Sequence, residues 1–452
     1  MTDVSVETTT RTETGLRGYL SELGPAWLAG AIAAGPATMA AVISAGASFG
    51  YALLWVVVLS AVLGSTAQYL SMRLGLLTEQ GIVATVEESL GEFWAWVLVI
   101  DTVLASGLAQ LVIMKTVADV SATITGVDAR LWGVLWAVFL ALALAGGGYH
   151  IAEIGAKLIV SVVVLAFIAS VFVVPIDGTA AVSGLAPTIP AGLDGALVAA
   201  GVLGGAVHIT LITMQTYTMR ARGWTREDYD LGLFDIGTSM LVAFGLFSLA
   251  TFLVAASVLH TPDVASAELD ALGAAEALGP LAGDYAAALF LAGLWGAAIS
   301  TLGANAVVPP YLIADKLDWD RDVSDSRFRG AIAVVALAGG LGAFLQGAFF
   351  PLLVLVLAFG LVGTPFVLVV VLYLLNDPDT VPEPNPTLAN VGGLVLIAIT
   401  TVLAVGFVED ELATASSNPV SAVVVAFAAA IGLATVGLVV KYLREASGLA
   451  SI

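Results

Sequence analysis

The residue best suited to chemistry in this sequence is His208, which stands in an otherwise apolar stretch shortly after the pair Gly204-Gly205. An imidazole can bind a transition metal, accept a proton near neutral pH or hydrogen-bond an organic substrate. The competing interpretation is a neutral histidine whose ring nitrogen bonds a neighbouring backbone carbonyl. We favour His208 as a ligand for substrate or metal, because an ionisable group in so apolar a segment is costly.

Two short runs combine helix-breaking residues with hydroxyl groups. We predict that both runs line a substrate site, together with one amide further along the chain. The predicted substrate-binding residues are Gly35, Pro36, Ala37, Thr38, Gly204, His208, Thr210 and Asn305. The hydroxyls of Thr38 and Thr210 could instead bond to carbonyl oxygens of their own helices. The amide of Asn305 could equally bond to a neighbouring helix.

Charged residues within or just inside the apolar stretches are the remaining candidates. Glu153 and Lys157 stand four positions apart, which favours a structural ion pair on one helix face. Asp101 and Asp235 could bind a coupling ion, H⁺ or Na⁺, or could be solvated residues near the ends of helices.

These residues are embedded in a chain suited to a lipid bilayer. Of its 452 residues, 59% are hydrophobic and 11% are charged, and the mean hydropathy is +1.02, whereas a soluble domain is typically about 25% charged. Runs of roughly 18 or more apolar residues recur, and each can cross a hydrocarbon core of about 30 Å as a helix. We therefore predict an all-α polytopic membrane protein with about twelve transmembrane helices. The predicted spans are 24–47, 51–74, 93–116, 130–147, 153–175, 193–219, 232–259, 284–314, 329–347, 349–375, 388–408 and 417–443.

The first and sixth predicted spans share an interruption near their centres. Gly35-Pro36 interrupts the first span, and Gly201 with Gly204-Gly205 interrupts the sixth, because proline removes a backbone donor and glycine favours unwinding. Each break alone could be a kink or a packing glycine. A matched pair five spans apart is typical of transporters with inverted five-helix repeats and discontinuous first and sixth helices, the LeuT type.

That architecture divides the chain into a tail, two repeats and two additional spans. The predicted parts are a disordered cytoplasmic tail at 1–23, repeats at 24–175 and 193–375, and the two further spans at 388–443. The tail lacks the apolar core of a signal peptide. Most Lys and Arg residues of the connections fall on the cytoplasmic side if the N-terminus is cytoplasmic, and the even number of spans then returns the C-terminus there. The predicted location is the cell membrane.

Composition and motifs exclude several other classes of protein. A net charge of −20, with 35 acidic and 15 basic residues, argues against a nucleic-acid partner and favours an extremely halophilic source over simple solubility. The sequence contains no cysteine, no zinc-protease or serine-hydrolase motif and no phosphate-binding loop. No enzyme activity, cofactor or ATPase domain is therefore predicted.

Several motifs of this chain are similar to those of one membrane protein family. They are Gly24-Pro25-Ala26-Trp27-Leu28, the run from Ala45 to Trp55, Gln68-Tyr69-Leu70, Arg73-Leu74-Gly75, the stretch from Gly204 to Asp235 and the stretch from Leu294 to Lys316. Over most of residues 24 to 375 the chain resembles the NRAMP family of divalent-metal transporters. The resemblance implies the inverted-repeat fold and proton-linked import of manganese- or iron-class ions.

The sequence departs from that family where the family holds its metal. The family's Asp-Pro-Gly-Asn motif aligns with Gly35-Pro36-Ala37-Thr38, which loses the carboxylate and the amide. Its Met-Pro-His motif aligns with His208-Ile209-Thr210, although a short slip would match His208 to the family histidine. The acidic pair of the third span aligns with apolar residues. Divalent metal transport is implied by the resemblance; a small polar solute such as an amino acid, or a transport-inactive sensor, is the alternative, because hard ions prefer carboxylates.

Overall fold

The computed structural model describes residues 35–146, 150–190, 193–261 and 269–446, and every regular element in these residues is a helix. Nine helical segments of the described chain are long and apolar enough to cross a membrane, and two shorter apolar helices accompany them. The predicted all-α polytopic fold is confirmed. The predicted tail, the first half of the first span and the side chain of Glu153 lie outside the described residues.

The described part of the first predicted span and each of the next four spans correspond to one helix. They are α3 (Pro36–Phe49), α4 (Leu54–Thr78), α6 (Glu92–Thr125), α7 (Ala129–Ala145) and α8 (His150–Ser170). Three short helices, which hydropathy does not predict, connect or follow them: η1 (Gly50–Leu53), α5 (Ile82–Leu90) and α9 (Gly178–Ser183). The third span is longer than predicted, because α6 continues for two more turns to the left-handed Gly126.

The later spans are mostly built from two helices each. They are α10 (Leu193–Val207) with α11 (Ile209–Ala221), α12 (Tyr229–Ile236) with η3 (Gly237–Phe244) and α13 (Gly245–Val258), α17 (Ala286–Ala306) with α18 (Val308–Lys316), α19 (Ser326–Gly339) with η6 (Gly340–Phe344), α20 (Phe349–Val362) with α21 (Thr364–Leu375), then α22 (Thr387–Thr414) and α23 (Pro419–Ala446). Short helices fill the connections: η2 (Arg226–Asp228), α15 (Ala271–Ala275), η4 (Glu276–Leu278), α16 (Gly279–Ala282) and η5 (Gly283–Tyr285).

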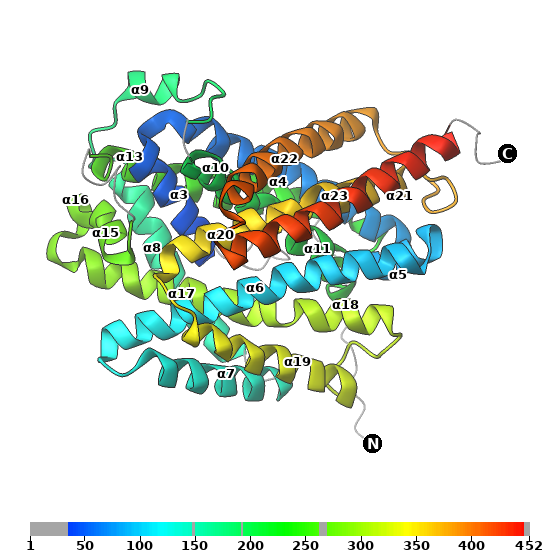
Figure 1. Ribbon diagram of the computed structural model, residues 1–452, viewed down its shortest axis with the longest axis horizontal. Coiled ribbons are helices and arrows are strands. Elements are labelled where there is room, and N and C mark those ends of the chain that lie inside the picture. The colour runs from blue at the N-terminus through cyan, green and yellow to red at the C-terminus, as the bar shows by residue number, and fades with distance from the viewer. Residues whose placement is uncertain (1–34, 147–149, 191–192, 262–268, 447–452) are drawn as a thin grey trace, which may run out of the picture.

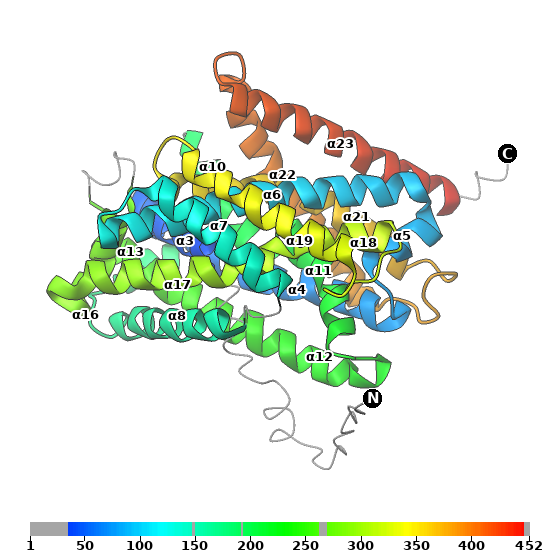
Figure 2. The ribbon, with the colours of Figure 1, turned by 90° about the horizontal axis from the view of Figure 1, so that it is seen from below.

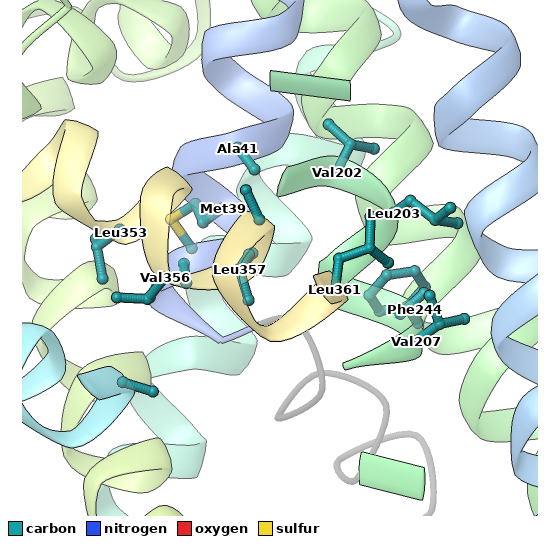
Figure 3. Close-up of a cluster of buried hydrophobic side chains, with 14 of the residues drawn as sticks. Met39, Ala41, Val202, Leu203, Val207, Phe244, Leu353, Val356, Leu357 and Leu361 are labelled. Atoms are coloured by element: carbon teal, nitrogen blue, oxygen red, sulfur yellow. The ribbon is translucent and has the colours of Figure 1, made fainter. Parts of the chain in front are cut away.

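Helix α10 lies at the centre of the bundle, where it contacts α3, α4, α20 and α22 (Figure 1). The helices that flank it are joined by an apolar cluster from four elements (Figure 3). This cluster contains Met39 and Ala41 of α3, Val202, Leu203 and Val207 of α10, Phe244 of η3, and Leu353, Val356, Leu357 and Leu361 of α20. In contrast, α23 lies along the edge of the molecule, and most of its apolar surface is exposed (Figure 2).

The sixth span is interrupted, but not at the glycines that the sequence indicates. Helix α10 is continuous through Gly201 and Gly204-Gly205, and it ends at Val207, so the predicted position of the break is wrong. The glycines instead permit close packing. A methyl group on Gly204 would lie 2.3 Å from the carbonyl oxygen of Leu357, and one on Gly205 would lie 2.7 Å from the hydroxyl of Thr38.

Two other spans are interrupted at positions where proline removes backbone donors. Val307 separates α17 from α18 just before Pro309-Pro310, and Gly363 separates α20 from α21 just before Pro365. The first span is described only from Gly35, which is extended and precedes Pro36 at the start of α3. The interruptions at Val207 and Gly363 lie close together, because the hydroxyl of Thr364 donates to the carbonyl oxygen of Val207.

Candidate substrate site

A cavity of about 110 Å³ lies where α3, α6, α11, α17 and α20 meet at the end of α10. It brings together residues that the sequence places more than two hundred positions apart. The lining residues are Gly35, Pro36, Ala37, Thr38, Ala109, Ile113, Gly205, His208, Thr210, Leu211, Thr301, Asn305, Val356 and Leu357. Seven of the eight predicted substrate-binding residues are in this set. Gly204 is not, because it packs against the backbone of α20.

His208 forms the junction between α10 and α11. Its Nδ1 lies 2.8 Å from the hydroxyl of Thr210 and accepts the backbone N–H of Thr210 over 3.3 Å, so the imidazole caps the start of α11. The side chain is buried, and among the described residues its Nε2 has no partner at good hydrogen-bond geometry, although the backbone carbonyl of Val356 interacts with the ring. The ring packs against Gly360, where a methyl group would lie 1.7 Å from Nε2.

Thr38 and Thr210, whose hydroxyls were predicted to bind substrate, both line the cavity. Thr38 lies in the first turn of α3 and is buried beside Gly205. That first turn has no side-chain cap, so the positive end of the α3 dipole faces the cavity. Thr210 is held by the imidazole of His208. Two helix N-termini, those of α3 and α11, therefore meet at this site.

Asn305 lines the cavity, but its side-chain amide is largely used in hydrogen bonds to α6. Its amide nitrogen donates to the carbonyl of Ser106 over 2.8 Å and to the side-chain oxygen of Gln110 over 3.0 Å. The hydroxyl of Ser106 donates back to the Asn305 backbone carbonyl over 3.2 Å. Pro309 cannot supply the helical donor to that carbonyl, which instead accepts the Ser106 hydroxyl and the backbone N–H of Val307. Asn305 thus joins α17 to α6 and forms one wall of the cavity.

Thr301 is a lining residue that the sequence analysis missed. Its hydroxyl is buried without a hydrogen-bond partner among the described residues, one helical turn before Asn305. It stands beside Ser300 in an otherwise apolar segment, so only its spacing from Asn305 on one helix face could have indicated it.

The two candidate coupling residues lie outside the cavity and differ from each other. Asp235 forms an ion pair with Arg222, with 3.2 Å between Oδ2 and the guanidinium, which favours a structural role. Asp101 is completely buried in α6 and has no hydrogen-bond or ion-pair partner among the described residues, so the alternative that it is a solvated helix end is wrong. Its carboxylate faces Gly363 at the interruption between α20 and α21.

The cavity offers few metal ligands. His208 is the one ionisable side chain among its lining residues. The described residues contain no group of three or more His, Cys, Asp or Glu that could hold a metal ion. The other polar side chains among the lining residues are the hydroxyls of Thr38, Thr210 and Thr301 and the amide of Asn305. Such a set can hold an ion only with help from water or backbone oxygens.

Interrupted helices around a central buried cavity define the class of secondary transporter with the LeuT-type fold. The family model described as Natural resistance-associated macrophage protein-like matches residues 26–410, and the chain therefore belongs to the Nramp family, as its resemblance implied.

The chain is similar to curated proteins that are named as divalent metal cation transporters. The chain is 27% identical over 324 residues to the divalent metal cation transporter MntH of Mycobacterium tuberculosis, an alignment that covers 69% of this chain and 73% of that protein. It is 28% identical over 312 residues to the MntH of Bacillus subtilis, covering 66% and 72% of the two chains.

Solved structures show the same fold. A manganese transporter of Eremococcus coleocola superposes with a TM-score of 0.71 at 16% identity, covering 98% of this chain and 99% of that one. A nucleobase–cation symporter superposes with a TM-score of 0.52 at 14% identity, covering 93% and 92%. At these identities the likeness concerns the fold alone.

Proposed function

We propose that this protein is a secondary active transporter that carries a divalent metal ion across the cell membrane. The observation that supports this most directly is the position of His208 at the junction of α10 and α11, in a buried cavity of an Nramp-family chain. The relatives named as divalent metal cation transporters support the same substrate class. Imidazole nitrogen is a good ligand for first-row transition metals.

Metal binding requires one tautomer of His208. For Nε2 to offer a lone pair, the ring proton must be on Nδ1 and be donated to the hydroxyl of Thr210, 2.8 Å away. Thr210 would then fix the orientation of the imidazole, as partners of metal-binding histidines commonly do. Hydroxyls, carbonyls at the end of α10 and water would complete the coordination.

A small polar solute, such as an amino acid, is the second candidate. It is favoured by the backbone N–H of Thr210, which lies 3.3 Å from Nδ1 and can only donate. In that tautomer Nε2 carries the proton and is a donor. Together with the N-termini of α3 and α11, it suits a carboxylate, and the lining residues include no acidic side chain that would repel one.

Uptake into proteoliposomes at high salt distinguishes these substrates. Mn²⁺, Mg²⁺ and a mixture of amino acids are offered to the wild type, to His208→Ala and to the matched control His260→Ala. His260 bonds the carbonyl of Ala47 and does not line the cavity. We expect saturable Mn²⁺ uptake that falls at least tenfold in His208→Ala, equivalent to about 1.4 kcal/mol, and is unchanged in His260→Ala.

Other outcomes of the same experiment identify the alternatives. Amino-acid uptake without metal uptake would replace the first candidate with the second. Bound metal or solute without flux would instead indicate a transport-inactive sensor.

We also propose that transport is coupled to H⁺ or Na⁺ and that both termini are cytoplasmic. The bias of Lys and Arg towards one set of connections supports this orientation. The chain has no cysteine, so single cysteines can report it directly. A cysteine at Asp379 should be labelled only from the cytoplasmic side and one at Ser417 only from the outside; the reverse pattern would invert the topology.

A further inference from the structure

The connection between α8 and α10 crosses the side of the protein that we place outside the cell. Residues 177–190 of this connection, which we call the outer strap, contain α9 and pack on η1 (Figure 1). The backbone N–H of Trp55 donates to the carbonyl of Gly184 over 2.9 Å, and its indole N–H donates to the carbonyl of Thr188 over 2.8 Å. The strap is therefore attached to the corner where α3 leads into α4.

Tyr51, in η1, forms a second attachment of the outer strap. Its hydroxyl oxygen accepts the backbone N–H of Asp177 over 3.3 Å and lies 2.6 Å from the hydroxyl of Ser257 on α13. Gly184 packs so closely on the backbone of Tyr51 that a methyl group on Gly184 would overlap the Tyr51 carbonyl oxygen. The strap thus meets the outer ends of α3 and α13 at one residue.

The far end of the outer strap leads directly into α10. The carbonyl oxygen of Pro190 lies against Gly195 in the first turn of α10, where an added methyl group would overlap it. Only one residue separates Pro190 from Thr188, whose carbonyl is held by the indole of Trp55. The outer end of α10 is therefore tied to the start of α4 by a very short length of chain.

An apolar contact between α3 and α10 separates the substrate cavity from this side of the protein. Met39 and Ala41 of α3 and Val202 and Leu203 of α10 belong to one buried apolar cluster (Figure 3). They lie just outward of the residues by which both helices line the cavity. A route from the outside to the cavity can open here only if α10 moves away from α3, and the outer strap opposes that movement.

The attachments of the outer strap are of a kind that can be released. Its bonds to Trp55 and Tyr51 are exposed, and α9 buries none of its own residues. Exposed hydrogen bonds exchange readily for bonds to water, and segments with few buried apolar contacts open most easily. In contrast, α3 and α13 pack through Gly46, where a methyl group would lie 2.7 Å from the backbone nitrogen of Ala256. The strap can therefore detach while α3 and α13 stay together.

We propose that the outer strap is a releasable latch that closes the substrate cavity to the outside. While the strap is attached to Tyr51 and Trp55, it holds the start of α10 beside α3, and the apolar cluster between them stays closed. Its detachment lets α10 move away from α3 and opens a route from the outside to His208. The latch would serve any substrate that enters from this side, so it does not depend on a metal ion as the cargo.

A reversible cross-link tests whether the outer strap must detach during transport. Ala52 and Ser183 line one cavity of about 370 Å³ between η1 and the strap, and the chain has no native cysteine. The double variant Ala52→Cys/Ser183→Cys is linked in proteoliposomes by a short, reducible bifunctional thiosulfonate. We expect Mn²⁺ uptake to fall at least tenfold on linking and to return on reduction, whereas each single-cysteine variant treated in the same way keeps its uptake. Uptake at the unlinked rate by the linked protein would overturn the proposal.

The reactivity of a cysteine in the cavity tests the latch without any substrate. Ile113→Cys places one cysteine in the cavity wall, and a membrane-impermeant thiol reagent is added outside. We expect Trp55→Phe, which removes the indole bond to Thr188, to raise the reaction rate about fivefold, as the loss of one hydrogen bond implies. Trp132→Phe is the matched control, because its indole N–H donates to Thr125 on another outer connection over 2.9 Å. An unchanged rate in Trp55→Phe would contradict the proposal.

A glycine substitution releases the outer strap in a second way. Gly184→Ala must displace the strap from Tyr51 and should also speed the reaction of Ile113→Cys, whereas Gly178→Ala in α9 adds a methyl group to open space and should not. Equal rates in the two variants would count against the latch. If the wild type takes up no Mn²⁺, the proposed substrate fails, and the reaction rates still decide whether the strap closes the cavity.

Discussion

The hydroxyl of Thr364 donates to the carbonyl oxygen of Val207 over 2.7 Å, and this bond joins the interruption of one span to the interruption of another. Helix α10 ends at Val207, so its last carbonyls have no helical donor. Thr364 is fully buried beside Gly363, where α20 also ends. The two broken spans are therefore held in one arrangement next to His208.

Removing this hydroxyl should loosen the site. Thr364→Val leaves the Val207 carbonyl buried and unsatisfied, which costs about 1–3 kcal/mol. We expect a lower unfolding temperature and weaker substrate binding, measured by thermal unfolding in lipid with and without Mn²⁺. The control is Thr400→Val, because the buried Thr400 hydroxyl bonds only carbonyls of its own helix, Leu396 and Ile397. Equal effects of both variants would show that the link between the breaks has no special role.

The space for the His208 ring depends on Gly360. Gly360→Ala places a methyl group 1.7 Å from Nε2, so the imidazole must leave its position. We expect uptake of the transported substrate to fall at least tenfold while the protein still inserts into the membrane. Gly432→Ala on α23 is a matched control, because nothing lies within 4 Å of the added methyl group. Wild-type uptake by Gly360→Ala would mean that His208 is not needed where it now lies.

A hydrogen bond between α11 and α18 should restrain the opening of the cavity. The hydroxyl of Tyr217 on α11 donates to Asp315 of α18 over 2.8 Å, and Asp315 also accepts the backbone N–H of Ala84 and pairs with Arg321. Tyr217→Phe removes this hydrogen bond, worth about 1 kcal/mol, and also the longer bond that the Tyr217 oxygen accepts from the backbone N–H of Val83 over 3.4 Å. The loss of the first bond alone should raise the open population roughly fivefold.

Because the sequence contains no cysteine, the reactivity of one introduced cysteine can report this opening. A single cysteine at the lining position Leu211 should react about fivefold faster with a membrane-impermeant reagent on the side of Asp315 when Tyr217→Phe is present. Tyr311→Phe is the control, since its ring packs on Tyr217 and its hydroxyl has no hydrogen-bond partner in the described chain. An unchanged rate would remove the contact from the opening mechanism.

The acidic composition predicts stabilisation by salt. At a net charge of −20, repulsion between carboxylates destabilises the compact state, and raising the ionic strength from about 0.1 M to 1 M shortens the screening length from about 10 Å to 3 Å. We expect the unfolding temperature in lipid to rise with KCl at pH 7. The effect should shrink near pH 4, where carboxylates begin to be protonated. A midpoint insensitive to salt at pH 7 would argue against a halophilic protein.

The sequence alone identified the spans, the family and half of the residues that line the cavity. Hydropathy is a local property, so it locates a helix such as α22 without knowledge of its neighbours. The runs around Pro36 and His208 were recognisable because helix breakers and polar groups are rare in apolar segments. Proline also marked the breaks before Pro309 and Pro365, although the sequence analysis did not use that signal.

Only the tertiary structure decided how these residues are used. The break of the sixth span lies at His208 rather than at Gly204-Gly205, because the glycines are needed where α20 and α3 approach α10. The amide of Asn305 and the carboxyl group of Asp101 look alike in sequence, as isolated polar groups in apolar helices. Asn305 bonds to Ser106 and Gln110, while the Asp101 carboxyl group faces Gly363 and has no hydrogen-bond partner among the described residues. Partners of this kind come from helices distant in sequence, so composition and spacing could not determine them.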